Sequence, residues 1–165
     1  MIVNAREWLG RPGFFVAASV AVLAGALGFQ YIGGIAPCVL CHWQRLPYVI
    51  VVALGAAALA LPRQRAWLLF AMAAALLAGS GVALYHVGVE AGWFQGTAAC
   101  GASGIAGSIA ELRTQIMTAP TARCGDIAWS LFGLSLADYN LIISTLLAAL
   151  AFRAAAMAAP RRSLP

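Results

Sequence analysis

Residues 66–89 read AWLLFAMAAALLAGSGVALYHVGV, a run that contains no Asp, Glu, Lys or Arg. A transmembrane helix needs about 20 mostly apolar residues, so this run predicts a membrane span. Similar runs predict three more spans, at about residues 13–31, 43–61 and 136–152. The chain is 63% hydrophobic and only 9% charged, which is more apolar than a soluble domain of this length. We therefore expect an all-α integral membrane protein, with residues 1–165 forming one domain built as a four-transmembrane-helix bundle.

The arginines predict the orientation of the bundle, because all ten basic residues of the chain are Arg. Seven of them flank span ends that would share one side: Arg6, Arg11, Arg63, Arg65, Arg153, Arg161 and Arg162. The positive-inside rule places both termini on the cytoplasmic side. The segments at about 32–42 and 90–135 then face a periplasm-like space. The net charge of +5 is thus explained by membrane topology, and nucleic-acid binding is not expected.

The longer outward loop, at about 90–135, is the only large polar segment. Its glycine-rich start at 96–107 predicts flexibility, and residues 109–117 are expected to form a short helix. A second stretch, Trp129 to Leu134, has the pattern of an amphipathic segment in the membrane interface. We therefore expect the long loop to rest on the membrane and to carry a short interfacial helix.

All four cysteines belong to the outward side: Cys38, Cys41, Cys100 and Cys124. Disulfides persist in such compartments and are rare in the cytosol. Cys38-Val-Leu-Cys41 has the spacing of an exchangeable redox pair. If the second span begins near Cys41, the helix dipole and Arg45, one turn later, would lower the Cys41 pKa and stabilise a thiolate at the membrane boundary. Such a thiolate could reach a lipid-soluble oxidant.

The loop pair, Cys100 and Cys124, has two interpretations. A bond between them could be a staple that restrains the loop, or it could offer a soluble partner an exposed site for thiol exchange. The flexible loop favours exchange. If both disulfides only staple the loops, the protein is a non-enzymatic membrane protein.

Two histidines carry further hypotheses. Cys38-Val-Leu-Cys41-His42 matches the attachment motif of c-type haem, but haem attachment would leave Cys100 and Cys124 unexplained. His86 lies near the outer end of the third span, where an ionisable residue is a candidate functional group, and it could donate a hydrogen bond to a quinone oxygen. A zinc site made from all four cysteines is disfavoured, because only one pair has ligand spacing. No metal site is expected.

The motifs together resemble the DsbB family of bacterial disulfide bond formation proteins. The resemblance rests on CVLCHWQR at 38–45, on CGDIAWSLFGLSLADYN at 124–140, and more weakly on His86 in LYHVG at 84–88. It covers nearly the whole chain. It implies a multi-pass protein of the bacterial inner membrane that acts as a thiol:quinone oxidoreductase.

The resemblance also implies roles for individual residues. A reduced DsbA-like oxidase with a thioredoxin fold would attack Cys100 and release Cys124, which would pass electrons towards Cys38 and open the Cys38–Cys41 bond. Cys41 would become the thiolate beside the quinone, and Arg45 would hold the quinone, with His86 as a further candidate contact. The electrons would leave for the membrane quinone pool, as ubiquinone or menaquinone.

Overall fold

The computed structural model describes residues 11–100, 108–110, 113 and 122–159. It has four long helices: α2 (Pro12–Tyr31), α3 (Val39–Ala60), α4 (Arg65–Glu90) and α6 (Leu136–Ala158). Each of the four is long and apolar enough to cross a membrane, α4 together with the preceding 3₁₀ turn η1 (Pro62–Gln64). The structure therefore confirms the prediction of a mostly helical chain with four potential membrane spans.

Two helices are longer than predicted. Helix α3 begins at Val39 because the Cys38 side chain caps it and accepts a hydrogen bond from the Cys41 backbone N–H. Both cysteines of the pair therefore belong to the first turn of α3, whereas the sequence placed the start of the span near Trp43. Helix α6 continues to Ala158, beyond the span expected at about 136–152. A long arginine side chain can extend its charge to the membrane surface without ending a helix.

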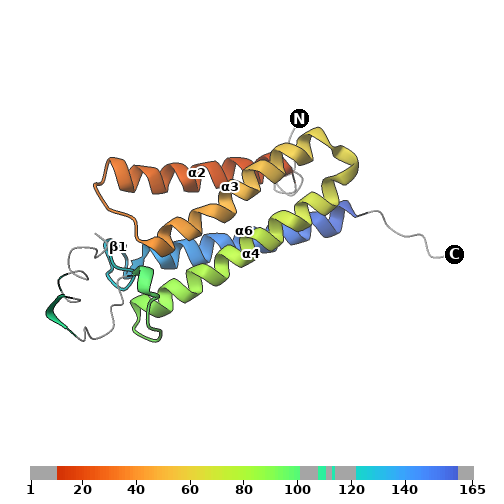
Figure 1. Ribbon diagram of the computed structural model, residues 1–165. Helices are drawn as coiled ribbons and strands as arrows, with labels where there is room; N and C mark the ends of the chain where they lie inside the picture. The colour runs from red at the N-terminus through yellow and green to blue at the C-terminus, as the bar shows by residue number, and fades with distance from the viewer. Residues whose placement is uncertain (1–10, 101–107, 111–112, 114–121, 160–165) are drawn as a thin grey trace.

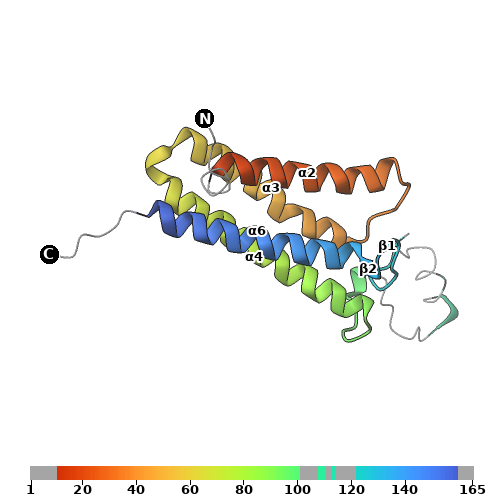
Figure 2. The same ribbon diagram turned by 180° about the vertical axis from the view of Figure 1, so that it is seen from behind.

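The helices run side by side with their connections at two opposite ends (Figures 1 and 2). The start of α2, the η1 turn and the end of α6 lie at one end. The α2–α3 connection, the end of α4 and the start of α6 lie at the other. This grouping matches the arginine pattern, in which Arg11, Arg63 and Arg153 were expected to share one side.

Helix contacts follow chain order, with α2 against α3, α3 against α4, and α4 against α6. The core contains large buried side chains of the first three helices, among them Phe15, Tyr48, Leu69 and Met72, and Leu147 and several alanines of α6 complete it. Close approach between α3 and α4 depends on Gly79, because a Cβ there would lie 2.8 Å from Pro47 Cγ. Small residues at such contacts are typical of membrane helix pairs.

A β-hairpin precedes α6, formed by β1 (Ser130–Leu131) and β2 (Leu134–Ser135). Phe132 and Gly133 form its turn, and both have positive φ, +52° and +79°, as a two-residue hairpin turn requires. The amphipathic segment predicted at 129–134 is therefore not helical. The predicted helix at 109–117 and the flexible stretch at 96–107 fall largely outside the described residues.

Candidate functional site

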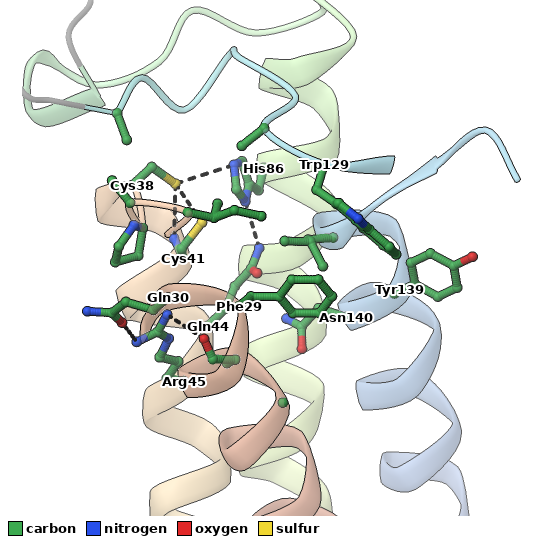
Figure 3. Close-up of a pocket in the computed structure, with 18 of the residues that line it drawn as sticks. Phe29, Gln30, Cys38, Cys41, Gln44, Arg45, His86, Trp129, Tyr139 and Asn140 are labelled. Atoms are coloured by element: carbon green, nitrogen blue, oxygen red, sulfur yellow. Dashed lines mark hydrogen bonds between the residues drawn. The ribbon is translucent and has the colours of Figure 1, made fainter. Parts of the chain in front are cut away.

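The redox pair lies where the α2–α3 connection enters α3 (Figure 3). Cys38 has an extended backbone, with φ −76° and ψ 172°, as the N-cap residue of a helix typically has. Its Sγ lies 3.2 Å from the Cys41 backbone nitrogen and 2.9 Å from Cys41 Sγ. Cys38 is buried and Cys41 is half-buried, and neither forms a disulfide with another residue. The structure thus holds the pair in its dithiol form.

His86 of α4 joins this pair from the neighbouring helix. Its Nε2 is 3.6 Å from Cys38 Sγ and 3.2 Å from the backbone oxygen of Cys124. Its Nδ1 is 3.0 Å from Gln44 Nε2. If Gln44 donates to Nδ1, Nε2 carries the hydrogen and donates it towards Cys38 and the Cys124 carbonyl. The imidazole therefore links the redox pair to the long loop, a contact that no sequence motif indicated.

Cys38 is the thiol that this arrangement favours as thiolate. The hydrogen bond with the Cys41 side chain is the main cause that lowers the Cys38 pKa to about 4, against the opposing effect of burial, and His86 and the Cys41 N–H add to it. Hydrogen bonds to a charged form favour that form. The sequence expected the thiolate at Cys41 instead, because the start of α3 at Val39 and the proximity of His86 could not be read from it.

This shift predicts an unusual pH dependence for alkylation of Cys38 in the reduced protein. An ordinary thiol, with a pKa near 8.5, loses about tenfold in rate for each pH unit below that value. With a pKa of about 4, the Cys38 rate should stay nearly constant from about pH 8 to pH 5. Iodoacetamide labelling followed by peptide mass spectrometry measures it, and urea-unfolded protein is the control.

The lowered pKa of Cys38 also makes the stability of the reduced fold depend on pH. Between about pH 4 and 8.5 the unfolded thiol binds a proton that folded Cys38 does not, so the reduced fold gains stability as the pH rises through this window and loses it as the pH falls to about 4.

The alkylation experiment can contradict the lowered pKa of Cys38. A tenfold fall in the alkylation rate of folded Cys38 between pH 8 and pH 7 would show that this thiol titrates as an ordinary one.

Cys100 and Cys124 form a disulfide in the loop. Cys100 ends the 3₁₀ turn η2 (Ala98–Cys100), and both cysteines are buried, at 3% and 0% exposure. They pack in one cluster with Cys38, Leu40 and Val89. The expectation of an exposed exchange site is therefore wrong for this conformation. Attack by a soluble partner requires the loop to uncover Cys100.

A carboxylate beside His86 was also missed from the sequence. Glu90 Oε1 lies 3.7 Å from His86 Nε2, one turn further along α4. Its other oxygen accepts a hydrogen bond from Ser135 Oγ at 2.5 Å. Ser135 in turn caps α6 in a reciprocal arrangement with Asp138. The i, i+4 spacing of His86 and Glu90 was the one signal that could have indicated this pair.

Arg45 projects from α3 towards α2. Its guanidinium donates to Gln30 Oε1 at 2.6 Å and is 3.5 Å from the Ala26 backbone oxygen. Figure 3 shows it below the cysteine pair, next to Gln30. Arg45 lies one turn after Cys41 on α3, as predicted, but its hydrogen bonds hold it against α2. His42 is exposed, so the second histidine of the motif region does not join the site.

A cavity of about 650 Å³ opens below the cysteine pair. Helix α2 lines it with Leu23 and Phe29, and Cys41, His86 and Asn140 reach it from the other three helices. The buried positions of α2 are confined to its first half, which leaves its outer half to form this wall. The volume is in the range of small-molecule sites, roughly 300–1,000 Å³. Cys38, Gln44 and Arg45 also border it, so the redox pair and a mostly apolar cavity share one space.

Asn140 of α6 leaves a buried donor at this cavity. Its Oδ1 accepts from Tyr48 OH at 2.6 Å, whereas its Nδ2 is buried and has no hydrogen-bond partner among the described residues. An orphaned buried donor calls for an explanation, such as a ligand. An apolar ring with carbonyl acceptors, the chemistry of a quinone, fits both the cavity and this donor set of Asn140, Arg45 and His86.

Comparison with known proteins decides the family. A family model described as disulfide bond formation protein DsbB matches residues 12–154. The chain belongs to the DsbB family. It is therefore a multi-pass membrane protein of disulfide bond formation, as the motifs indicated.

One relative of this DsbB-family protein is itself uncharacterised. It is a protein of Rickettsia prowazekii (strain Madrid E), 26% identical over 134 residues, which are 78% of this chain and 77% of the relative. No solved structure matches the chain. The family assignment therefore rests on the family model, and the roles of individual residues remain to be argued from the geometry.

Proposed function

We propose that this protein is a thiol:quinone oxidoreductase that reoxidises a periplasmic DsbA-like dithiol oxidase and delivers the electrons to a membrane quinone. The observation that carries the proposal is the position of the Cys38–Cys41 pair. It borders a cavity within the helix bundle on one side and packs with Cys100 and Cys124 on the other. One pair of thiols is thereby placed between a loop disulfide and a space for an apolar acceptor.

The electron transfer follows from four exchange steps. A partner thiolate attacks Cys100 Sγ, the Cys100–Cys124 bond breaks, and Cys124 leaves as a thiolate. Cys124 then attacks Cys38 Sγ of an oxidised Cys38–Cys41 pair and releases Cys41 as a thiolate. The second thiolate of the partner attacks the sulfur that the partner has bonded to Cys100, which forms the partner disulfide and releases Cys100. Cys100 finally attacks Cys124, which re-forms the loop disulfide and releases Cys38, so two electrons remain on Cys38 and Cys41. The described state, with Cys100 bonded to Cys124 and a free inner pair, corresponds to this point.

His86 supports the second step. By contacting both Cys38 Sγ and the Cys124 carbonyl, it holds the attacked sulfur and the attacking residue within one hydrogen-bonded unit. Reactions in which the groups are held together avoid much of the entropic cost of a bimolecular encounter. We assign His86 this positioning role in addition to a contact with the quinone.

The cavity residues hold the acceptor, with Asn140 Nδ2 and the Arg45 guanidinium as donors to its oxygens. A bound quinone supplies a two-electron, two-proton acceptor. Gln30 keeps Arg45 in place through the bond at 2.6 Å, and the apolar wall excludes water, which strengthens these hydrogen bonds. Ubiquinone and menaquinone both present such oxygens.

A test of the whole proposal follows the ultraviolet absorbance of ubiquinone with purified protein in detergent and a reduced DsbA-like protein. Catalytic loss of the quinone signal, matched by partner oxidation, is expected. A visible haem spectrum in the purified protein would favour the electron-carrier alternative instead. If neither ubiquinone nor menaquinone supports turnover and the thiols resist exchange, the result would favour the other alternative, a non-enzymatic membrane protein whose disulfides only restrain its loops.

Removing the free donor of Asn140 should weaken quinone binding selectively. Asn140→Leu keeps the branching of the side chain but removes Nδ2 together with Oδ1. A hydrogen bond is worth about 1 kcal/mol, so KM for quinone should rise about fivefold with kcat nearly unchanged. Tyr48→Phe is the matched control, because it deletes the bond to Asn140 Oδ1 while Nδ2 stays. Equal KM changes in both variants would show that the polar pair matters only for packing.

A further inference from the structure

The geometry points to a binding site for a thiophilic divalent cation, of the zinc class, formed by Cys38, Cys41 and His86 when the pair is reduced. Among the described residues, the two Sγ atoms and a ring nitrogen of His86 lie within 4.8 Å of one another. Two thiolates and an imidazole are the ligand types that Zn²⁺ prefers. The sequence did not suggest this set, because His86 is far from the cysteines along the chain and comes to them only through the packing of α4 against α3.

The distances suit a tetrahedral ion with a small adjustment. With Zn–S near 2.3 Å and Zn–N near 2.0 Å, a sulfur and a nitrogen ligand should be about 3.6 Å apart. Cys38 Sγ and His86 Nε2 are 3.6 Å apart. Two sulfur ligands should be about 3.8 Å apart, whereas the Cys38 and Cys41 sulfurs are separated by 2.9 Å. The half-buried Cys41 side chain therefore has to move by about 1 Å.

Gln44 provides the outer support that such a site needs. Ligation through Nε2 requires the hydrogen on Nδ1, and metal-bound histidines usually donate that hydrogen to a neighbouring acceptor. The Gln44 amide lies 3.0 Å from Nδ1 and presents its oxygen there once the amide is turned over. The ion also replaces the hydrogen bond from Nε2 to the Cys124 carbonyl.

Glu90 lies beside the site rather than in it. Its Oε1 is 3.7 Å from His86 Nε2, and Ser135 holds its other oxygen. Glu90 does not belong to the group whose ligand atoms all lie within 4.8 Å of one another. A water molecule would therefore supply the fourth ligand of a tetrahedral ion.

Occupation of the site depends on the redox state. Binding forms bonds from the ion to both sulfurs, and the hydrogen of the Cys41 thiol leaves as a proton. Zn²⁺ does not change oxidation state, so the two electrons stay on the sulfurs and the Cys38–Cys41 bond cannot form until the ion leaves. The oxidised pair offers no thiolate. The site therefore traps the reduced protein, and this inference does not rest on the proposed reaction with quinone.

Cobalt binding tests the inference without quinone or partner. Full-length protein carrying Cys100→Ser and Cys124→Ser, which removes the loop thiols, is reduced, kept anaerobic in detergent and titrated with Co²⁺. The expected result is one ion per chain, with sulfur-to-cobalt charge-transfer bands and the visible bands of a tetrahedral ion, all lost when Zn²⁺ displaces cobalt. The same protein with its Cys38–Cys41 pair oxidised should show none of these bands. Absence of the bands in the reduced protein would overturn the inference.

Matched histidine variants identify the nitrogen ligand. His86→Ala should weaken cobalt binding at least tenfold, and Gln44→Ala by about 10- to 100-fold. His42→Ala should leave the affinity unchanged, since His42 is exposed next to Cys41. If His86→Ala aggregates, the cobalt affinity of Gln44→Ala still tests whether His86 is the nitrogen ligand. Unchanged affinity in Gln44→Ala, or a loss confined to His42→Ala, would overturn the assignment of His86.

Discussion

Cys41→Ser is expected to stop catalytic quinone reduction, with turnover at least about 1,000-fold lower than in the unmodified protein. The variant cannot form the Cys38–Cys41 bond, so the inner pair can neither accept nor release two electrons. Cys41 also borders the cavity, as Cys38, Gln44 and Arg45 do. Loss of ubiquinone absorbance under excess reduced partner measures the effect.

The same variant should keep one turnover of partner oxidation. Its Cys100–Cys124 disulfide is intact and can oxidise one equivalent of partner dithiol before the relay stops. Rapid acid quenching and thiol labelling of the partner would count that single equivalent. His42→Ala is the matched control at the neighbouring exposed position and should retain turnover. Continued quinone reduction by Cys41→Ser would refute the role of the inner pair.

Much of the fold followed from composition and charge. Four apolar runs predicted four helices, and the arginines predicted which helix ends share a side, because both signals depend on transfer of side chains into lipid rather than on contacts. The differences lie in local detail. Cys38 caps α3, so the helix begins before the expected span. The segment expected in the membrane interface contains a hairpin turn at Phe132 and Gly133.

The site was predictable only in part. Spacing identified the Cys38–Cys41 pair, and position in the third span singled out His86. Contacts between helices were not predictable from one sequence, and they decide that Cys38 rather than Cys41 collects the hydrogen bonds. The same holds for Asn140, whose orphaned Nδ2 becomes visible only when α6 packs beside the cavity.

The two interpretations of the loop pair can now be separated physically. A buried disulfide packed against Val89 and Leu40 has the environment of a staple. Yet the same packing places Cys124 next to the imidazole that contacts Cys38, as exchange between the two pairs requires. Burial of Cys100 therefore sets a condition on access by the partner, while the position of Cys124 favours a relay.

Cys100→Ser is expected to abolish oxidation of the partner, including the single equivalent that Cys41→Ser retains. Without the Cys100–Cys124 bond the partner thiolate has no loop disulfide to attack. The inner pair and its cavity are unchanged, so a small dithiol such as dithiothreitol should still drive quinone reduction through Cys38 and Cys41. In the single variant, the free Cys124 could pair with Cys38. The double variant, Cys100→Ser with Cys124→Ser, excludes this pairing and should likewise reduce quinone with dithiothreitol but not with the partner.

Comparison of the two electron donors makes this prediction decisive. Loss of turnover with the partner but not with dithiothreitol assigns Cys100 to partner exchange, because the defect then lies before the inner pair. Loss with both donors would indicate that the loop disulfide is a staple on which the fold of the site depends. Since Cys100 is only 3% exposed, the rate of the first exchange should also be limited by opening of the loop. That rate should then reach a plateau as the partner concentration rises, whereas an exposed sulfur would give a rate that keeps increasing linearly.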